Sequence, residues 1–373
     1  MRVHFFLRTL NDSTGGGSHY NSLAFIRALR AHGHTVVVHV FYDRGNDFPE
    51  DVQPLVHDGF GRGHLGERAY LAELLREYES EVDVYFLYAV EFAWGGGFYR
   101  RTGGTVPCVV YMDAYLSSMR RTHPRDLSMW WYQFKRLPWD KTIGLLDVKH
   151  IDQFIPVASY IGDVYKKFGF PRNRFTVMPS IVPPPPDISI QQKEQELVTV
   201  LYVGRLIYEK GVDLLIDALA SLTQFPWRLV IVGDGPMREE IQKKVDTSNL
   251  PIEVKGWVTR EEVWDAYKTA DIFVHPARWS DPGPRSIVDA LWCSLPVVVP
   301  DTGGSAWNAG SAGVVFKTGD LVSLTEALKK LLESKELRQT LASKALKEAE
   351  RFTEESVYPQ LEGILLSVIN KNL

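Results

Sequence analysis

Two carboxylates in the second half of the chain have a spacing and setting that suit ligand binding. Asp281 and Asp289 lie in the stretch DPGPRSIVDALWCSLPVVVP, with seven residues between them. The first lies in a Pro/Gly turn before a predicted helix, and the second lies inside that helix. A carboxylate inside the helix can accept hydrogen bonds from ribose hydroxyls. The amides of Arg285 and Ser286 at the helix start can also face a ligand. The pair indicates either a sugar-nucleotide site or, more simply, an acid at a helix start and a solvated acid.

Two cations stand in the stretch GRLIYEKG, which leaves a predicted strand and leads into a helix. Arg205 and Lys210 are fixed charges that can neutralise a diphosphate. Gly204 and Gly211 bound this stretch, and Gly211 suits a tight turn into the helix. Read alone, Lys210 is compatible with an exposed ion pair to Glu209. Together, the two cations favour an anion site.

A second glycine-rich turn, Gly15–Gly17, follows the first predicted strand and precedes a helix. Glycines there let backbone amides approach an anion at the positive end of the helix. Gly16 and Gly17 are therefore predicted donor-binding residues, and the alternative is a flexible first turn. The spacing is not GxGxxG, and no acidic residue ends the second strand, which argues against a nicotinamide site.

Polar and aromatic side chains of the first half supply further candidates. Asp113 ends a predicted strand in VYMDAY. It can bind a ligand or simply cap the following turn. His19 and His123 are candidates for the same region, and His19 is assigned to acceptor binding. Trp130 and Trp131 can stack on acceptor sugar rings or pack in the core.

In the second half, VGDGP and KGWV end strands that can frame a nucleotide base. Val258 is assigned to donor binding, whereas the ring of Trp257 is predicted to be core.

The bulk composition limits the class of protein. A chain of 373 residues with 45% hydrophobic and 24% charged residues is typical of a soluble globular protein with two domains. No apolar run is long enough to span a bilayer, and the N-terminus reads as a strand, not a secretion signal. Cys108 and Cys293 lie in different halves, which fits a reducing compartment. The net charge of -4 argues against nucleic-acid binding. We therefore expect a cytoplasmic protein.

Two series of short Val/Ile-rich strands alternate with amphipathic helices, a pattern typical of parallel sheets covered on both faces. The first series has strands at MRVHFFL, HTVVVHVFY, VDVYFLY, VPCVVYM, FIPVAS and FTVMPS, and the second at LVTVLYV, WRLVIVG, IEVKGWV, DIFVHPA, LPVVVPD and GVVFK. Four consecutive prolines mark a linker between them. We predict two Rossmann-like α/β domains, residues 1–186 and residues 187–351. A helix over 352–373 is expected to cross back to the first domain, with a ligand cleft at the carboxyl ends of both sheets.

Charge is unevenly distributed between the halves. Residues 1–186 carry 21 Lys+Arg and 19 Asp+Glu, whereas residues 187–373 carry 21 and 27. Within the first half, residues 92–141 mix basic and aromatic side chains. This stretch is expected to serve partly as core and partly as an acceptor surface or a contact with the inner face of the membrane.

The second half resembles the nucleotide-binding domain of retaining glycosyltransferase family 4, which has the GT-B fold. The matching motifs occur in family order over about residues 198–333: GRL…EKG, VGDGP, GWV, ADIFVHPA, the Asp281–Asp289 stretch, LPVVVPDTGG and GVVFKTGD. The first half resembles the family's acceptor domain more loosely, through its Gly loop and ALRAHGHTVVV.

The resemblance implies transfer of a sugar from a nucleotide sugar to a hydroxyl acceptor, with retained anomeric configuration and no obligatory metal or other cofactor. The acceptor would be a glycan, a lipid-linked saccharide or a small glycoside. Arg205 and Lys210 would bind the departing diphosphate, Asp289 the ribose and Asp281 the donor sugar. The Gly15–Gly17 loop would complete the phosphate site.

Three positions depart from the family pattern. Asp281 and Asp289 stand where Glu is usual, each one methylene shorter, so that the ligand must sit closer or be reached through water. Pro284 removes an amide that could reach the donor. Asp113 stands near the place where the family often has a His, and by that likeness it would stabilise an oxocarbenium-like centre or bind a sugar hydroxyl. Two other functions stay open: a nucleotide-sugar isomerase or hydrolase, and a non-catalytic nucleotide-sugar or glycan-binding protein.

Overall fold

The computed structural model describes residues 1–10, 17–41, 48–58, 63–116, 127–185 and 197–372. The chain forms two compact units. Unit 1 comprises Met1–Ile181 and Glu354–Leu373, and unit 2 comprises Val182–Thr353. The predicted domain boundary at residue 186 lies close to this division.

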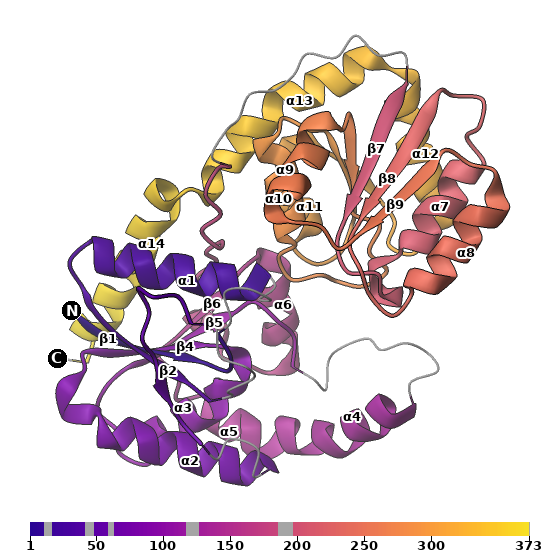
Figure 1. Cartoon of the computed structure of the whole chain (residues 1–373). Helices are drawn as coiled ribbons and strands as arrows, with labels where there is room; N and C mark the ends of the chain where they lie inside the picture. The colour runs from indigo at the N-terminus through magenta and orange to yellow at the C-terminus, as the bar shows by residue number, and fades with distance from the viewer. Residues whose placement is uncertain (11–16, 42–47, 59–62, 117–126, 186–196, 373) are drawn as a thin grey trace. The chain divides into compact units, whose positions relative to one another are not determined.

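Unit 1 is built on a parallel sheet in the order β3-β2-β1-β4-β5-β6. Its strands are β1 (Arg2–Leu7), β2 (Thr35–Val40), β3 (Leu55–Val56), β4 (Val84–Tyr88), β5 (Cys108–Met112) and β6 (Gln153–Pro156). Its helices are α1 (Gly17–Ala31), α2 (Gly63–Glu77), α3 (Ala93–Arg101), α4 (Leu127–Trp139), α5 (Leu145–Val148), α6 (Ser159–Phe168) and α14 (Glu354–Asn370). Helices α1 and α14 lie on one face of the sheet, and α2, α3 and α5 lie on the other (Figure 1). Every residue of β4 and of β5 is buried, as expected for strands covered on both faces.

The C-terminal helix α14 is fixed to unit 1 by a cluster of rings. The hydroxyl of Tyr358 lies 2.8 Å from Nε2 of His34. The ring of Tyr358 stacks on that of His32, with centroids 3.6 Å apart. Polar and aromatic contacts therefore hold the end of the chain against α1 and the loop that follows it.

One predicted strand of unit 1 is absent. The segment FTVMPS makes only an isolated bridge, between Phe175 and Phe154. The amides of Thr176 and Met178 donate to the carbonyls of Phe154 and Pro156. The segment thus follows the edge of β6 without forming a regular ladder.

Unit 2 has a second parallel sheet, in the order β12-β11-β10-β7-β8-β9. Its strands are β7 (Val198–Val203), β8 (Trp227–Val232), β9 (Ile252–Gly256), β10 (Ile272–Val274), β11 (Val297–Pro300) and β12 (Gly313–Phe316). Its helices are α7 (Val212–Ala220), α8 (Arg238–Ser248), α9 (Arg260–Thr269), α10 (Arg285–Trp292), α11 (Ser305–Ala309), α12 (Leu321–Glu333) and α13 (Lys335–Ala349). Each unit is therefore a doubly wound α/β sheet, as the sequence predicts.

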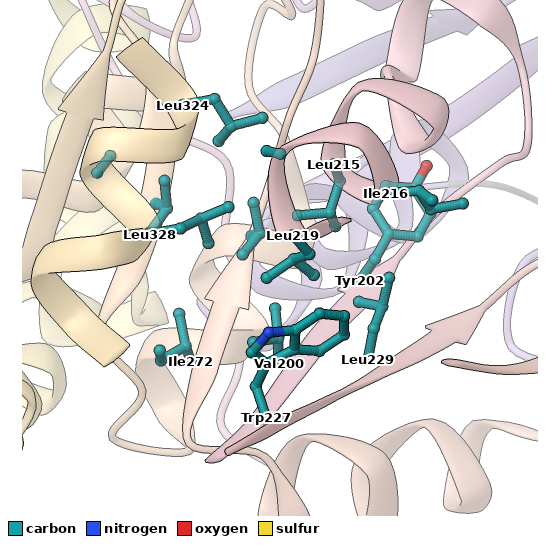
Figure 2. Close-up of a cluster of buried hydrophobic side chains, with 14 of the residues drawn as sticks. Val200, Tyr202, Leu215, Ile216, Leu219, Trp227, Leu229, Ile272, Leu324 and Leu328 are labelled. Atoms are coloured by element: carbon teal, nitrogen blue, oxygen red, sulfur yellow. The ribbon is translucent and has the colours of Figure 1, made fainter. Parts of the chain in front are cut away.

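The strands of unit 2 send alternate side chains to two hydrophobic layers. Val200, Tyr202 and Leu229 pack with α7 and α12 in one layer, which Figure 2 shows. Leu201 and Val230 belong to the other layer, with residues of α9, α10 and α13. This alternation follows from the two-residue period of a strand and leaves the strand ends free for a site.

Helix starts in unit 2 are set by capping residues. Thr259 and Glu262 form a capping box at the start of α9. The side chains of Asp320 and Ser334 accept hydrogen bonds from Ser323 and Leu337 at the starts of α12 and α13. Across the described residues, no helix is long and apolar enough to cross a membrane.

Three histidines form a chain of hydrogen bonds inside unit 1. Nδ1 of His39 lies 2.8 Å from Nε2 of His57, and Nε2 of His39 lies 3.0 Å from Nδ1 of His4. The His39 ring is fully buried and stacks on Phe6, with centroids 4.3 Å apart. Burial, with the neighbouring imidazoles, lowers the pKa of His39 to about 2. Burial also lowers the pKa of His4 and of His57. The folded state therefore keeps these imidazoles neutral.

The three hydrogen-bonded histidines make the stability of unit 1 dependent on pH. Because the folded pKa of each of these histidines lies below its unfolded value of 6.5, the unfolded state binds more protons at acid pH. Their stabilisation is complete above about pH 6.5 and is lost as the pH falls below it, by about 1.4 kcal/mol per pH unit for each histidine that stays neutral. Urea unfolding of the full chain between about pH 7.5 and about pH 5.5 measures this loss.

The variant His39→Phe should show a shallower pH dependence than the wild type. His150→Gln, at an exposed histidine of the same unit, should not change the slope. If the free energy of unfolding had the same pH dependence in all three proteins, the hydrogen-bonded histidines would not cause it.

Candidate functional site

The carboxyl edge of the unit 2 sheet gathers the charged residues predicted for the donor. Strands β7 and β10 are neighbours in the sheet. From β7 the chain continues to β8 and β9 on one side, and from β10 it continues to β11 and β12 on the other. Such a switch point opens a crevice at the carboxyl ends of parallel strands, where ligands bind in folds of this kind. Arg205 and Lys210 follow β7, and Asp281 follows β10.

Lys210 and Asp281 form an ion pair between their Nζ and Oδ2 atoms. Lys210 lies in a short 3-10 turn, Tyr208–Lys210, and Asp281 lies in the loop before α10. The imidazole of His275, the residue directly after β10, is 2% exposed, and its Nε2 lies 3.4 Å from the same Oδ2. That nitrogen makes no hydrogen bond of standard geometry to any described residue. Two nitrogens from different loops thus approach one oxygen of Asp281.

The electrostatics of this group keep Asp281 ionised. Burial by itself raises the pKa of Asp281, but the Lys210 ammonium and the adjacent imidazole outweigh burial and hold that pKa well below its usual range. Burial lowers the pKa of His275, and Lys210 lowers it further. The site therefore contains a carboxylate, an ammonium and a neutral imidazole.

Arg278 fixes the turn that carries Lys210. Its guanidinium donates to both carboxylate oxygens of Asp213, at 2.5 and 2.7 Å, and to the carbonyl of Tyr208 at 3.2 Å. It also lies over the Tyr208 ring, 4.6 Å from the centroid. The backbone amide of Arg278 donates to the Glu209 carbonyl. A bidentate pair of this kind restrains orientation as well as distance, so the β10–α10 loop positions the Lys210 turn.

Two glycines allow the loops to approach this closely. Gly211 has φ +69°, and a Cβ built on it would lie 2.1 Å from the Pro276 carbonyl oxygen. Gly303, after β11, has φ +73°, and its Cβ would lie 2.2 Å from the Asp281 carbonyl oxygen. The amide of Gly304 donates to that same oxygen at 2.7 Å. The Asp281 backbone is therefore in contact with Gly303 and Gly304, and a side chain at Gly211 or Gly303 would require the facing backbone to move.

Arg205 remains exposed at the end of β7. Among the described residues its guanidinium makes no hydrogen bond or ion pair, whereas its carbonyl accepts from the buried Tyr202 hydroxyl at 2.8 Å. Gly204 precedes Arg205 and packs against Gly233. A Cβ built on Gly233 would lie only 1.9 Å from the Gly204 carbonyl oxygen. The backbone of this cation is thus fixed, and its charge is available to a ligand.

Asp289 and Arg285 lie one turn apart on α10. Nε of Arg285 lies 3.6 Å from Oδ1 of Asp289, and this oxygen is buried without a hydrogen bond. Burial raises the pKa of Asp289, and the Arg285 charge opposes that rise. The carbonyl of Ser286 accepts from the Tyr267 hydroxyl at 3.0 Å, which ties the start of α10 to α9.

The loop after β9 differs from the prediction at one residue. Val258 is half-buried next to α9, but Trp257, expected in the core, is 74% exposed. Gly256 ends β9 with φ +73°, and the chain turns there into the loop. At this turn the Trp257 ring reaches solvent and does not enter either hydrophobic layer.

Unit 1 carries a cavity of about 230 Å³ at the carboxyl ends of β1, β4 and β5. Asp113 and His19 both line it. The Ser18 hydroxyl donates to Oδ2 of Asp113 at 2.5 Å. Burial raises the pKa of Asp113 and lowers that of His19. Two residues predicted separately therefore share one pocket.

The remaining predicted residues lie elsewhere or outside the described structure. Gly16 and His123 fall outside the described residues, and Gly17 is the first residue of α1. Trp130 and Trp131 belong to α4, and Trp131 is 61% exposed.

Several residues of these sites were not singled out from the sequence. His275 is a polar residue directly after the buried strand IFV, which is a usable signal for a group at the carboxyl edge. Arg278 and Asp213 are 65 positions apart, and no local pattern pairs them. Glu91, which also lines the cavity of unit 1, lies in a helical turn after β4.

Comparison with known proteins gives matches over both units. The model described as Glycosyltransferase Family 4 matches residues 15–184, and that described as Glycosyl transferases group 1 matches residues 186–348. The sulfoquinovosyl transferase SQD2 of Arabidopsis thaliana is 29% identical over 170 residues, which is 44% of this chain and 32% of that protein. The alpha-D-kanosaminyltransferase of Streptomyces kanamyceticus is 30% identical over 172 residues, 44% of each chain. The match thus spans less than half the length of either relative.

Solved structures resemble the whole chain. A sucrose-phosphate synthase from Thermosynechococcus elongatus has a TM-score of 0.77 at 17% identity, with 99% of each chain covered. HepE of Anabaena, solved with UDP, has a TM-score of 0.72 at 19% identity, with 98% of this chain and all (100%) of that chain covered. These likenesses show that the fold is GT-B, as the sequence predicts.

The close approach at Gly211 can be tested by substitution. Gly211→Ala and Gly319→Ala both place a side chain at a positive φ, +69° and +73°, but only Gly211 has backbone within reach of the new Cβ. The left-handed conformation alone costs roughly 1–2 kcal/mol. We expect about that loss for Gly319→Ala, and at least about 3 kcal/mol for Gly211→Ala because the Pro276 carbonyl must also move. Urea unfolding measures both, and equal losses would show that the loops are not in contact.

Proposed function

Because this chain belongs to the glycosyltransferases of group 1 and family 4, we propose that it uses a nucleoside diphosphate sugar as donor. The sugar passes to a hydroxyl of a saccharide or lipid-linked acceptor, with retention of the anomeric configuration. The observation that carries the donor assignment is the carboxyl edge of unit 2. An exposed guanidinium and a largely buried ammonium–carboxylate pair lie on the loops that follow β7 and β10, the strands of the switch point, and a partly buried carboxylate lies on α10, the next helix.

The chemistry of the donor assigns a role to each group. A diphosphate carries charge that grows as the glycosidic bond breaks, and fixed cations stabilise it most when they are already in place. Arg205 is exposed and Lys210 is held by the Arg278 clamp, so both can receive phosphate oxygens without a large rearrangement. Asp289 accepts from the ribose hydroxyls, and Asp281 from a hydroxyl of the donor sugar.

The same two cations make the diphosphate site independent of a metal in this proposal. Arg205 and Lys210 supply the positive charge that a divalent ion supplies in metal-dependent transferases. Donor binding is therefore expected to persist in the presence of a chelator. UDP is the first nucleotide to test, because HepE of Anabaena, a structural relative, was solved with UDP and with UDP-glucose.

Binding of a nucleoside and its diphosphate should separate the roles of Arg205 and Asp289. Arg205→Gln removes a charge from the diphosphate and should weaken UDP binding about tenfold to a hundredfold, with uridine binding unchanged. Asp289→Asn removes an acceptor for the ribose and should weaken UDP and uridine by similar factors. Titration calorimetry in EDTA measures both, with GDP, dTDP and ADP and their nucleosides used if UDP does not bind.

The matched control is Arg228→Gln. Arg228 lies at the amino end of β8 and donates to the Thr199 hydroxyl at 2.9 Å, at the opposite edge of the sheet. This variant should bind UDP like the wild type. An equal loss of UDP and uridine in Arg205→Gln, or unchanged UDP binding in Asp289→Asn, would overturn the assignment of these residues.

We propose further that α4 contacts a membrane that holds the acceptor or lies close to it. The helix runs away from the sheet of its unit (Figure 1). Trp131 and Phe134 are 61% and 71% exposed, and their rings stack with centroids 5.9 Å apart. Exposed Lys141 and Lys149 follow α4 in the chain. Exposed aromatic rings in a segment that also carries basic side chains suit the interface of an anionic bilayer.

Vesicle binding tests this contact. The full chain should co-sediment with vesicles that contain phosphatidylglycerol more than with pure phosphatidylcholine vesicles, and salt should weaken the binding. The double variant Trp131→Ser/Phe134→Ser should lose most of it. Trp257→Ser, which removes an equally exposed ring from unit 2, should retain it. Binding that survives the double variant would rule out α4 as the contact.

A further inference from the structure

The cavity of unit 1 has the size of a site for one small ring. Its volume of about 230 Å³ is below the roughly 300–1,000 Å³ of sites for drug-sized ligands. It is formed at the ends of three parallel strands, and most of the side chains that line it are polar. Leu7, Arg8, Thr9, Ser18, His19, Ser22, Tyr88, Ala89, Glu91, Asp113 and Ala114 form its walls.

The charges on these walls do not balance. Nη1 of Arg8 lies 3.4 Å from Oε1 of Glu91, so that this cation and this carboxylate compensate one another. Burial lowers the pKa of His19, which keeps its imidazole neutral near pH 7. Asp113 is then the remaining charged group of the wall, and it is negative.

Asp113 has hydrogen-bond donors but no cation. The Ser18 hydroxyl donates to its Oδ2 at 2.5 Å, and the Tyr88 hydroxyl lies beside it. Across the described residues no Lys or Arg forms an ion pair with this carboxylate. Burial raises its pKa, as does the negative charge of Glu91. A carboxylate withdrawn from water without a counter-charge is unfavourable. A cation bound in the cavity would remove that penalty.

We infer that the cavity takes an acceptor ring that bears an ammonium group, such as an amino sugar or an aminocyclitol, with the ammonium paired to Asp113. This inference rests on the proposed transferase function and adds the chemical class of its acceptor. The serine, tyrosine and histidine side chains of the wall supply partners for the ring hydroxyls. An acceptor with a carboxylate or phosphate at this position would face Asp113 and Glu91 and be repelled.

Binding of matched sugars to the full chain tests the inference. The probes are glucose, its 2-amino, 3-amino and 6-amino derivatives, one aminocyclitol and glucuronic acid, measured by ligand-observed NMR near neutral pH. At least one amino compound should bind about tenfold or more tightly than glucose, because a hydrogen bond to a charged group exceeds a neutral one by that order. Added salt should reduce the preference, and glucuronic acid should bind least.

Variants at Asp113 assign the preference to this carboxylate. Asp113→Asn keeps the shape and should abolish the difference between amino sugar and glucose, whereas Asp113→Glu keeps the charge and should preserve a preference. Far-UV circular dichroism and a cooperative urea transition verify that each variant is folded. A preference that survives Asp113→Asn, the absence of any preference in the wild type, or tighter binding of glucuronic acid would overturn the inference.

These experiments distinguish a wrong acceptor class from a wrong proposed function. If UDP binds and Arg205→Gln weakens it while no amino compound is preferred, only the acceptor class is wrong. If no nucleoside diphosphate binds at all, the proposed function itself is wrong, whatever the sugars do.

Discussion

The contact between the loops that follow β7 and β10 is the constraint on which the proposed donor site depends. It brings Lys210 and Asp281 together as a largely buried ion pair, and it is permitted because Gly211 has no side chain where the Pro276 carbonyl lies. Arg278 adds a bidentate bond across the same contact. A buried pair is worth little to stability unless its geometry is held. Here the loop backbone and the Arg278 guanidinium hold that geometry. The charges of Lys210 and Asp281 are therefore in position before a ligand binds.

The two cations of this edge have different states in the ligand-free chain. Lys210 is already neutralised by Asp281, whereas Arg205 is exposed and has no partner among the described residues. A diphosphate would therefore meet Arg205 first as a free charge and would share Lys210 with Asp281. Unit 1 shows the opposite case, because no Lys or Arg of the described residues pairs with the Asp113 carboxylate. In each unit this charge lies at the carboxyl edge of the sheet, where no described residue compensates it and a ligand can do so.

The fold was largely predictable from the sequence, because it depends on local patterns. Runs of buried Val and Ile predict the strands, and the charged residues at strand ends predict the edge at which a ligand binds. The pairing of Arg278 with Asp213 was not predictable, since it depends on the closeness of two loops far apart in the chain. The exposure of Trp257 was also missed, because a large apolar residue after a strand is usually buried and only the turn at Gly256 directs it outward. The second nitrogen beside the Asp281 carboxylate belongs to the buried His275, which follows a short apolar strand and has no distinctive motif of its own.

The most direct test of the central claim follows the reaction by proton NMR with an α-configured nucleotide sugar and an acceptor. The account predicts that nucleoside diphosphate is released only when acceptor is present. It also predicts that the new glycoside has the α configuration from its first appearance. Release at the same rate without acceptor would identify a hydrolase. No release under any condition, with the donor bound, would identify a binding protein, and a β-configured product would contradict retention.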